Sequence, residues 1–386
     1  MPNQFYQFQP GLEQLRQQGL YRTRRVIDGP QSVLLRIDGK SVINFSSNDY
    51  LGLANHPQVV DAFKKALQQY GVGSGSAHLI SGHSLAHQAL EEELAEFTGR
   101  DRVLLFSTGY MANLGVISAL VGRGDHVFED RLNHASLLDG GLLSRAQFNR
   151  YRHTDYEHLQ DQLQRSAGRK LVVSDGVFSM DGDLADLPLL AGLVEQHQAG
   201  LLIDDAHGFG VLGKTGGGIV EHFGLTQYQV PVLMGTLGKA FGTFGAFIAG
   251  SDSLIEWLIQ KARTFVFTTA LPAALAEATR ASLSLLQTES WRREHLQALI
   301  ARFRLGAIQQ GLQIMDSFTP IQPVVVGDSQ RVLAISSALM ERGFLVSPIR
   351  PPTVPNGTAR LRITFSAEHN HQQVDALLDA LGQVIP

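Results

Sequence analysis

Between residues 100 and 250, short apolar runs alternate with segments long enough to form helices, and this pattern limits the possible folds more than any other feature. The runs are VLLF (103–106), HVFED (126–130), LVVSD (171–175), LLIDD (201–205), PVLMGT (231–236) and AFIAG (246–250). Continuous apolar runs are typical of strands that are buried on both faces. The pattern therefore predicts an α/β fold with a mostly parallel central sheet covered by helices.

The remaining segments divide the 386 residues into three predicted parts. Residues 1–45 are expected to form an N-terminal arm with a polar helix and a short hairpin. Residues 46–275 form the large domain, which opens with amphipathic helices from Pro57 and around Leu90. Residues 276–386 form a smaller α+β domain, whose segments are ALAEATRASLSLLQ, IQPVVVG, FLVSPI, RLRITFS and a final helix.

Composition excludes several classes of protein. The formal net charge is only −4, with charges of both signs mixed along the chain, so no nucleic-acid partner is expected. The absence of cysteine excludes disulfides and thiolate chemistry and agrees with a cytoplasmic location. The sequence has neither a signal peptide pattern nor eighteen consecutive apolar residues, so no membrane association is expected.

Three polar residues follow two neighbouring runs in an order that indicates pyridoxal phosphate. Asp204 and His207 lie in LLIDDAHGFG, and Lys239 lies in MGTLGKAFG. This cofactor needs a lysine amine for its aldehyde, attached as a Schiff base, and a carboxylate that keeps its pyridine nitrogen protonated. His207 is placed to reach the phenolic oxygen. Taken singly, the aspartate could cap a helix and the lysine could be solvated, but the combination favours the cofactor.

The cofactor's phosphate needs several donors, and STGYMAN after the first run offers a turn that opens a helix. Ser107, Gly109 and Tyr110 are the candidates there, and Thr236 adds a hydroxyl. An ordinary strand-to-helix turn is the alternative. GTLGKAFG is not a P-loop, because Leu233 replaces the first glycine and the residue after the lysine has no hydroxyl.

Other polar residues near the strand ends are weaker candidates. His134 in RLNHASLLDG could lie over the cofactor ring or could cap a helix, and Ser179 in DGVFSMDGD could face the phenolic oxygen or serve a turn. No metal site is expected, since His83 and His87 lack a third ligand. In the last domain Arg350, Arg360 and Arg362 are close in sequence, and at least one is expected to bind a substrate carboxylate.

These motifs together resemble the α-oxoamine synthases, which are fold-type I pyridoxal-phosphate enzymes. The resemblance extends from about Leu20 to His371. It is carried by NFSSNDYLGL, SGHSLAHQALEEELAEF, LNHASLLDG, DGVFSMDGD, IDDAHGFGVLG and GTLGKAFG. It implies the fold-type I architecture and pyridoxal 5′-phosphate as cofactor.

The resemblance also assigns roles to individual residues. Lys239, Asp204, His207 and His134 match the catalytic positions, while Gly109, Tyr110, Ser179 and Thr236 match positions that hold the cofactor. Arg22, Asn48, Thr353 and Arg362 match substrate contacts, although Arg24 and Arg25 compete with Arg22. Thr268 and Thr269 resemble residues that reach the phosphate of a neighbouring subunit, which implies a homodimer with shared active sites.

The segment IRPPTVPNGTARLR is most similar to the biotin-pathway branch of this family. That branch implies condensation of L-alanine with a pimeloyl thioester, carried by CoA or by acyl carrier protein. Alternatives are another α-oxoamine synthase such as glycine C-acetyltransferase, an aminotransferase on the same fold, or a partner subunit without activity. The last would be expected to lack Lys239.

Overall fold

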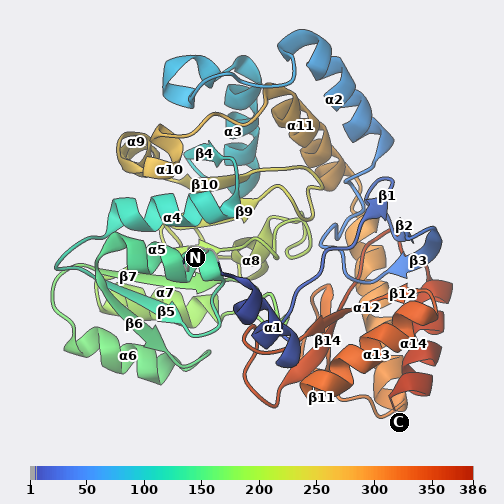
Figure 1. The fold of residues 1–386 in the computed structure, drawn as a ribbon. Coiled ribbons are helices and arrows are strands. Elements are labelled where there is room, and N and C mark those ends of the chain that lie inside the picture. Colours follow the sequence, from blue (N-terminus) through green and yellow to red (C-terminus); the bar gives the residue numbers. More distant parts are fainter. Residues whose placement is uncertain (1–4, 6, 386) are drawn as a thin grey trace.

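The computed structural model describes residues 5 and 7–385, and a seven-stranded sheet forms its centre (Figure 1). The strand order is β4-β10-β9-β8-β7-β5-β6. The strands are β4 (Arg102–Phe106), β5 (His126–Asp130), β6 (Gln147–Tyr151), β7 (Lys170–Asp175), β8 (Gly200–Asp204), β9 (Val232–Thr236) and β10 (Ala246–Gly250). The five strands from β9 to β6 are parallel, and β10 alone runs antiparallel to its two neighbours. The predicted, mostly parallel sheet is therefore confirmed.

Helices cover both faces of this sheet, which explains why its strands read as continuous apolar runs. Leu202 and Ile203 are neighbours on β8, and they pack into two different apolar layers. One layer contains residues of α4 (Gly109–Leu120), α5 (Ala135–Ser144), α9 (Asp252–Lys261) and α10 (Arg263–Val266). The other contains residues of α3 (Leu85–Thr98), α6 (Tyr156–Arg165), α7 (Leu187–Gln196) and α8 (Gly218–His222).

The C-terminal part has a small sheet of its own, with strand order β11-β14-β13 and antiparallel pairing throughout. Its elements are α11 (Ala273–Thr288), α12 (Trp291–Gln309), β11 (Ile321–Gly327), α13 (Ser329–Glu341), β12 (Phe344–Leu345), β13 (Ser347–Ile349), β14 (Ala359–Thr364) and α14 (His371–Val384). Across the described ranges, none of the helices combines the length and apolar character that a membrane crossing requires.

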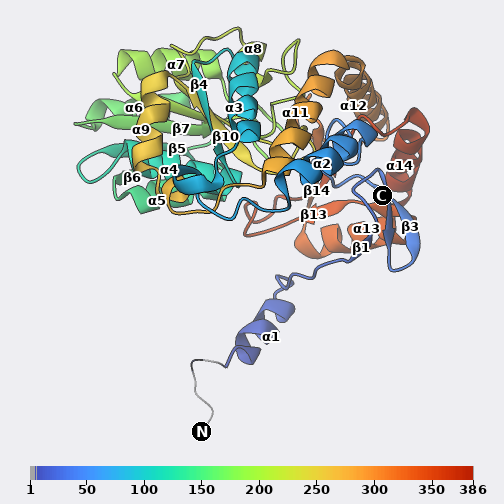
Figure 2. The same ribbon diagram turned by 90° about the horizontal axis from the view of Figure 1, so that it is seen from above.

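The N-terminal segment has two different parts. Helix α1 (Gln9–Gln17) projects away from the body of the molecule (Figure 2). Strands β1 (Ile27–Asp28), β2 (Leu34–Ile37) and β3 (Lys40–Asn44) form the expected hairpin region, and β3 pairs in parallel with β12. The hairpin thus lies on the C-terminal part, while the boundaries at residues 45 and 275 stay predictions. After it come α2 (Pro57–Tyr70) and the π-helical turn η2 (His78–Gly82).

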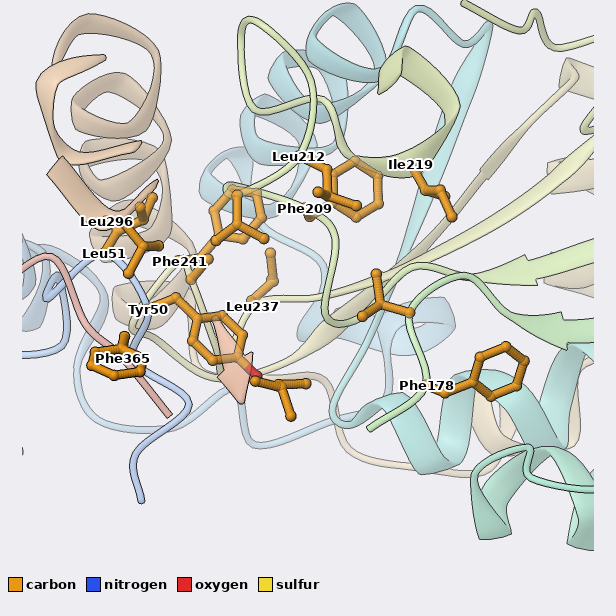
Figure 3. Packing of buried hydrophobic residues seen from close by; sticks show 14 of the residues in the cluster. Tyr50, Leu51, Phe178, Phe209, Leu212, Ile219, Leu237, Phe241, Leu296 and Phe365 are labelled. Carbon is orange, nitrogen blue, oxygen red and sulfur yellow. The ribbon is translucent and has the colours of Figure 1, made fainter. Parts of the chain in front are cut away.

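A buried cluster joins the two parts of the molecule next to the carboxyl ends of the strands. In Figure 3, Tyr50 and Leu51 lie close to Leu296 of α12 and to Phe365, and Phe209 and Leu212 belong to the same cluster nearer the large sheet. All six side chains are at most 3% exposed. Because segments from both parts share this core, the residues that follow the strands of the large sheet are held against β14.

Candidate active site

A cavity of about 190 Å³ opens at the carboxyl ends of the parallel strands. The ends of β7, β8 and β9 and the first residues of α4 and α5 meet there. It is lined by Gly109, Tyr110, His134, Ser136, Asp175, Ser179, Asp204, Ala206, His207, Met234, Thr236 and Lys239. This edge is where open α/β sheets bind ligands. The structure therefore brings together eight of the residues that the sequence singled out for the cofactor.

Asp204 ends β8 and is buried, with only 5% of its surface exposed. Its Oδ2 accepts a hydrogen bond of 2.7 Å from Asn113 Nδ2, and its Oδ1 accepts one of 3.0 Å from the backbone N–H of Ala206. Both carboxylate oxygens are thus fixed by donors. Such a carboxylate is suited to hold a protonated nitrogen of a ligand.

Asp175 ends the neighbouring strand β7 and stands opposite Asp204 in the sheet register. Burial raises the pKa of Asp175 well above its ordinary value, and the nearby charge of Asp204 raises it further. The backbone N–H of His134 donates to Asp175 Oδ2 at 2.9 Å. Burial and the neighbouring carboxylate therefore both favour the neutral form of Asp175.

Lys239 follows β9, and its Nζ lies 2.8 Å from His207 Nε2. Burial lowers the pKa of Lys239 to about 8, although Asp204 and Asp175 oppose the shift. The pKa of His207 is held well below 6.5 by burial and then by the charge of Lys239. About a tenth of the lysine is therefore an uncharged amine at pH 7, far more than for an ordinary lysine, and this is the form that reacts with an aldehyde.

The loop that carries Lys239 approaches the backbone of another segment closely at Gly242. Gly242 has a φ of +66°, and a Cβ at this position would collide with the backbone of Leu53 and Ala54. The last glycine of GTLGKAFG is therefore required by a close backbone approach.

The amino end of α4 faces the same cavity. Thr108 caps this helix by accepting a hydrogen bond of 3.2 Å from the backbone N–H of Met111. Gly109 and Tyr110, its first two residues, line the cavity, so the positive end of the helix is directed to a ligand there. Thr236 also lines it, whereas Ser107 does not.

His134 and Ser179 both reach the cavity, from different loops. His134 caps α5, since its Nδ1 accepts from the backbone N–H of Ser136. His134 therefore both caps α5 and lines the cavity, so both of its predicted roles are compatible with its position. Ser179 lines the cavity in the loop after β7, and its carbonyl oxygen accepts a hydrogen bond of 2.6 Å from Arg362 Nε.

Two of the expected substrate contacts are linked to the lysine through Tyr50. Both terminal nitrogens of Arg362 lie 3.2 Å from Asn48 Oδ1. The Tyr50 hydroxyl lies 3.2 Å from the same oxygen and 2.6 Å from His207 Nδ1. Arg362 therefore lies at the end of a hydrogen-bonded path that begins at Lys239.

The other two substrate candidates line a separate cavity of about 530 Å³, between the N-terminal arm and residues 347–353. Arg22, Arg25 and Thr353 are among its lining residues, but Arg24 is not. Arg350 binds the arm by donating from Nε to the carbonyl oxygen of Gly19 at 2.8 Å. Arg360 is buried and paired with Asp181, so it is not free to bind substrate.

Thr268 and Thr269 do not line the cavity around Lys239. Thr269 is exposed and forms an isolated bridge with Ala77, and Thr268 donates to the carbonyl oxygen of Thr264. Their expected contact with the phosphate of a second subunit stays a prediction.

Comparisons with known proteins agree with this geometry. The family model for aminotransferase class I and II matches residues 40–381. Curated 8-amino-7-oxononanoate synthases from Thioalkalivibrio sulfidiphilus and Cellvibrio japonicus are 63% and 62% identical to this chain. They cover 96% and 97% of it, and 95% and 94% of their own lengths. The chain belongs to the 8-amino-7-oxononanoate synthase family, within aminotransferase class I and II.

Solved structures give the same result for the fold. Serine palmitoyltransferase from Sphingomonas wittichii superimposes with a TM-score of 0.94 at 33% identity, over 99% of this chain and 98% of that one. The 8-amino-7-oxononanoate synthase of Francisella tularensis gives a TM-score of 0.79 at 31% identity, over 89% and 97%. A structure of SPT with PLP, 32% identical, gives 0.92 over 98% and 97%. The resemblance to α-oxoamine synthases and the fold-type I architecture are thus confirmed.

In this member of the 8-amino-7-oxononanoate synthase family, the sequence reasoning missed several residues around the cavity. Asp175 ends an apolar run in the same way as Asp204, so the same signal was available for it. Asn113 stands out only as an amide in an apolar helix. Ser136 and Tyr50 were missed because their hydrogen bonds to Asn113 and His207 join segments far apart in the sequence.

Proposed function

We propose that this protein condenses L-alanine with a pimeloyl thioester, on CoA or acyl carrier protein, to give 8-amino-7-oxononanoate in biotin biosynthesis. A carbon–carbon bond forms between alanine Cα and the thioester carbonyl. The carbon–sulfur bond breaks to release the thiol, and the alanine carboxyl group leaves as carbon dioxide. The observation that carries the proposal is Lys239 beside His207 and Asp204, in a chain more than 60% identical to synthases of this name.

The residues of the cavity fit pyridoxal 5′-phosphate. Lys239 offers an amine with a lowered pKa for the aldehyde, Asp204 offers a fixed carboxylate for the ring nitrogen, and the first residues of α4 offer backbone donors for the phosphate. When bound, this cofactor withdraws electrons from a carbanion at the amino acid's Cα. His134, His207 and Ser179 line the same space and would contact the ring.

The chain's own residues then divide the remaining work. Lys239 is the base for the Cα proton of alanine, because its pKa of about 8 leaves uncharged amine near neutral pH. Asp204, fixed by Asn113 and by the backbone of Ala206, would pair with the ring nitrogen of the cofactor. Arg362, oriented by Asn48, binds the amino acid's carboxylate, for which a guanidinium is well suited.

The homodimer and the cytoplasmic location are part of the same proposal. Support for the dimer comes from exposed apolar side chains around the loop after α2 and near Thr268. Val72, Ile80, Leu85 and Phe267 are 70–82% exposed. Patches of this kind mark interfaces between proteins. Light scattering should give about twice the chain mass of 42.1 kDa.

A substrate panel tests the reaction. The purified enzyme is incubated with L-alanine and pimeloyl-CoA, with L-alanine and pimeloyl-acyl carrier protein, and with glycine and acetyl- or succinyl-CoA, while free thiol is followed. Thiol release is expected with the alanine and pimeloyl pairs, and Lys239→Ala should lower it about 10³-fold or more. Thiol release with glycine alone would point to another α-oxoamine synthase, and pyruvate without thiol to an aminotransferase.

A further inference from the structure

Three hydrogen bonds link Asp204 to His134 beneath the cavity, through two residues that have no assigned role. Asn113 Nδ2 lies 2.7 Å from Asp204 Oδ2 and 2.9 Å from Ser136 Oγ. Ser136 Oγ lies 2.8 Å from His134 Nδ1. Asn113 is on α4 and Ser136 is on α5, and both are at most 1% exposed. The path therefore runs through the packed interface of two helices, away from water.

Chemistry fixes the direction of each bond along this path. An ionised carboxylate only accepts, so the amide group of Asn113 must turn its NH₂ and not its oxygen toward Asp204. The second hydrogen of that NH₂ is donated to Ser136 Oγ. The serine's own hydrogen is then available for His134 Nδ1. Only one arrangement of protons along the path therefore satisfies all three hydrogen bonds.

Two further observations agree with this direction. The backbone N–H of Ser136 also donates to His134 Nδ1, at 3.3 Å. This nitrogen therefore accepts from both the hydroxyl and the backbone of Ser136. Asn113 Oδ1 is buried without a hydrogen-bond partner in the described part of the chain. A buried carbonyl oxygen without a partner is costly. The unpaired oxygen therefore indicates that the site depends on the two N–H donors of the Asn113 amide and not on its carbonyl oxygen.

An Nδ1 that accepts two hydrogen bonds leaves the proton of the neutral ring on Nε2. Burial lowers the pKa of His134, the charge of Lys239 acts in the same direction and Asp204 opposes it, so the neutral form is favoured. The imidazole borders the cavity, and Tyr110 packs edge-on against it at 6.4 Å between centroids. The ring can then donate from Nε2 but cannot accept there.

We propose that Asn113 and Ser136 are positioning residues that hold His134 as the Nε2–H tautomer and couple it to the carboxylate of Asp204. This inference deepens the proposed function, since it assigns His134 the part of a neutral hydrogen-bond donor to an oxygen of the substrate. A carbonyl or carboxylate oxygen is the matching chemical group. The proton arrangement itself does not depend on which thioester the enzyme uses.

The test reads the tautomer directly and needs no acyl donor. The holoenzyme is labelled with ¹⁵N-histidine, and the His134 signals are assigned as those missing in His134→Asn. At pH 8 the wild type is expected to show a protonated Nε2 and an unprotonated Nδ1. Ser136→Ala removes the hydroxyl donor at 2.8 Å and leaves Nδ1 only the longer backbone N–H at 3.3 Å, so it should give a mixture of tautomers and a higher pKa for His134. Asp204, Lys239, Asp175 and Tyr110 stay unchanged around the ring.

Activity and two control variants complete the experiment. Ser136→Ala should lower kcat by about tenfold, the factor that corresponds to one hydrogen bond, with little change in KM for alanine. Ser136→Thr keeps the hydroxyl and should keep the wild-type tautomer. Ser144→Ala removes another buried hydroxyl from the same helix, one that donates to Gly141, and should behave as wild type.

Several outcomes would overturn the proposal. A proton on Nδ1 in the wild type would do so, as would an unchanged tautomer in Ser136→Ala. Equal losses in Ser136→Ala and Ser144→Ala would show a general packing effect instead. If the tautomer is as expected but no thiol is released from any thioester, the proposed function fails while the positioning role stands.

Discussion

Two histidines at the same edge of the large sheet are held in opposite states of charge. His207 follows β8, and its two nitrogens contact the Tyr50 hydroxyl and Lys239 Nζ. His153 follows β6, and its two nitrogens lie 2.9 Å from Asp130 Oδ1 and 2.8 Å from Asp183 Oδ2. Burial disfavours the positive charge on both rings. The charges of the neighbouring groups decide the outcome.

The pKa values follow these surroundings. Burial and the charges of Lys239 and Arg362 keep the pKa of His207 well below 6.5. Burial also opposes the charge on His153, but the hydrogen bonds and charges of Asp130 and Asp183 outweigh it and raise the pKa to about 10. The site thus keeps one imidazole neutral beside the reactive amine and uses another as a fixed cation.

The fixed cation ties together two loops that reach the cavity. Asp130 also accepts from the backbone N–H groups of Leu132 and Thr154, so it shapes the segment that leads to His134. Asp183 belongs to the loop that carries Ser179. His153, Asp181 and Asp183 are close enough to hold a metal ion, but Arg360 pairs with Asp181 and His153 joins the other carboxylates. The protein's own cations, Arg360 and His153, thus already pair with the carboxylates of this cluster.

Replacing His153 should have the largest effect, on stability. His153→Gln removes the positive charge and leaves Asp130 and Asp183 facing each other, with Asp130 only 1% exposed. Loss of one partner of a buried charge pair should cost about 3 kcal/mol of stability. The urea unfolding midpoint of the holoenzyme measures the change. His222→Gln is the control, because His222 is exposed. An equally small change in the unfolding midpoint of both variants would contradict the role of His153.

The pH dependence of stability separates the two histidines further. The pKa of His153 in the folded protein, about 10, lies above its ordinary value of 6.5, so protonation favours folding. The stabilisation should be complete below pH 6.5 and disappear as the pH rises through 10. His207 is uncharged in both the folded and the unfolded chain well above pH 6.5, so it should contribute no slope between about pH 8 and 10. Thermal unfolding at several pH values should show the gap between wild type and His153→Gln narrowing from pH 7 to 10, and a constant gap would contradict this.

Sequence reasoning succeeded where the signal is local. Strand β8, which ends at Asp204, and strand β9, which precedes Lys239, are buried on both faces, so each reads as an apolar run that ends at a polar residue. Strand β6 was missed because it lies at the edge of the sheet, where QFNRY is largely accessible. The partners of the site residues were missed for another reason. Asn113 is 91 positions from Asp204 and Tyr50 is 157 from His207, so only the folded chain brings them together.

Removing the Tyr50 hydroxyl should have a smaller effect, confined to the contacts of His207 and Asn48. The Tyr50 ring is fully buried against Phe365 (Figure 3), so Tyr50→Phe keeps the packing and removes only the contacts with His207 and Asn48. Loss of the hydrogen bond between the Tyr50 hydroxyl and His207 should cost about 1 kcal/mol of transition-state stabilisation and lower kcat/KM by no more than about tenfold. Steady-state kinetics with alanine as the varied substrate measures this, with the exposed Tyr228→Phe as control. If the loss approached that of Lys239→Ala, the neutral state of His207 would depend on the tyrosine rather than on burial and the surrounding cations.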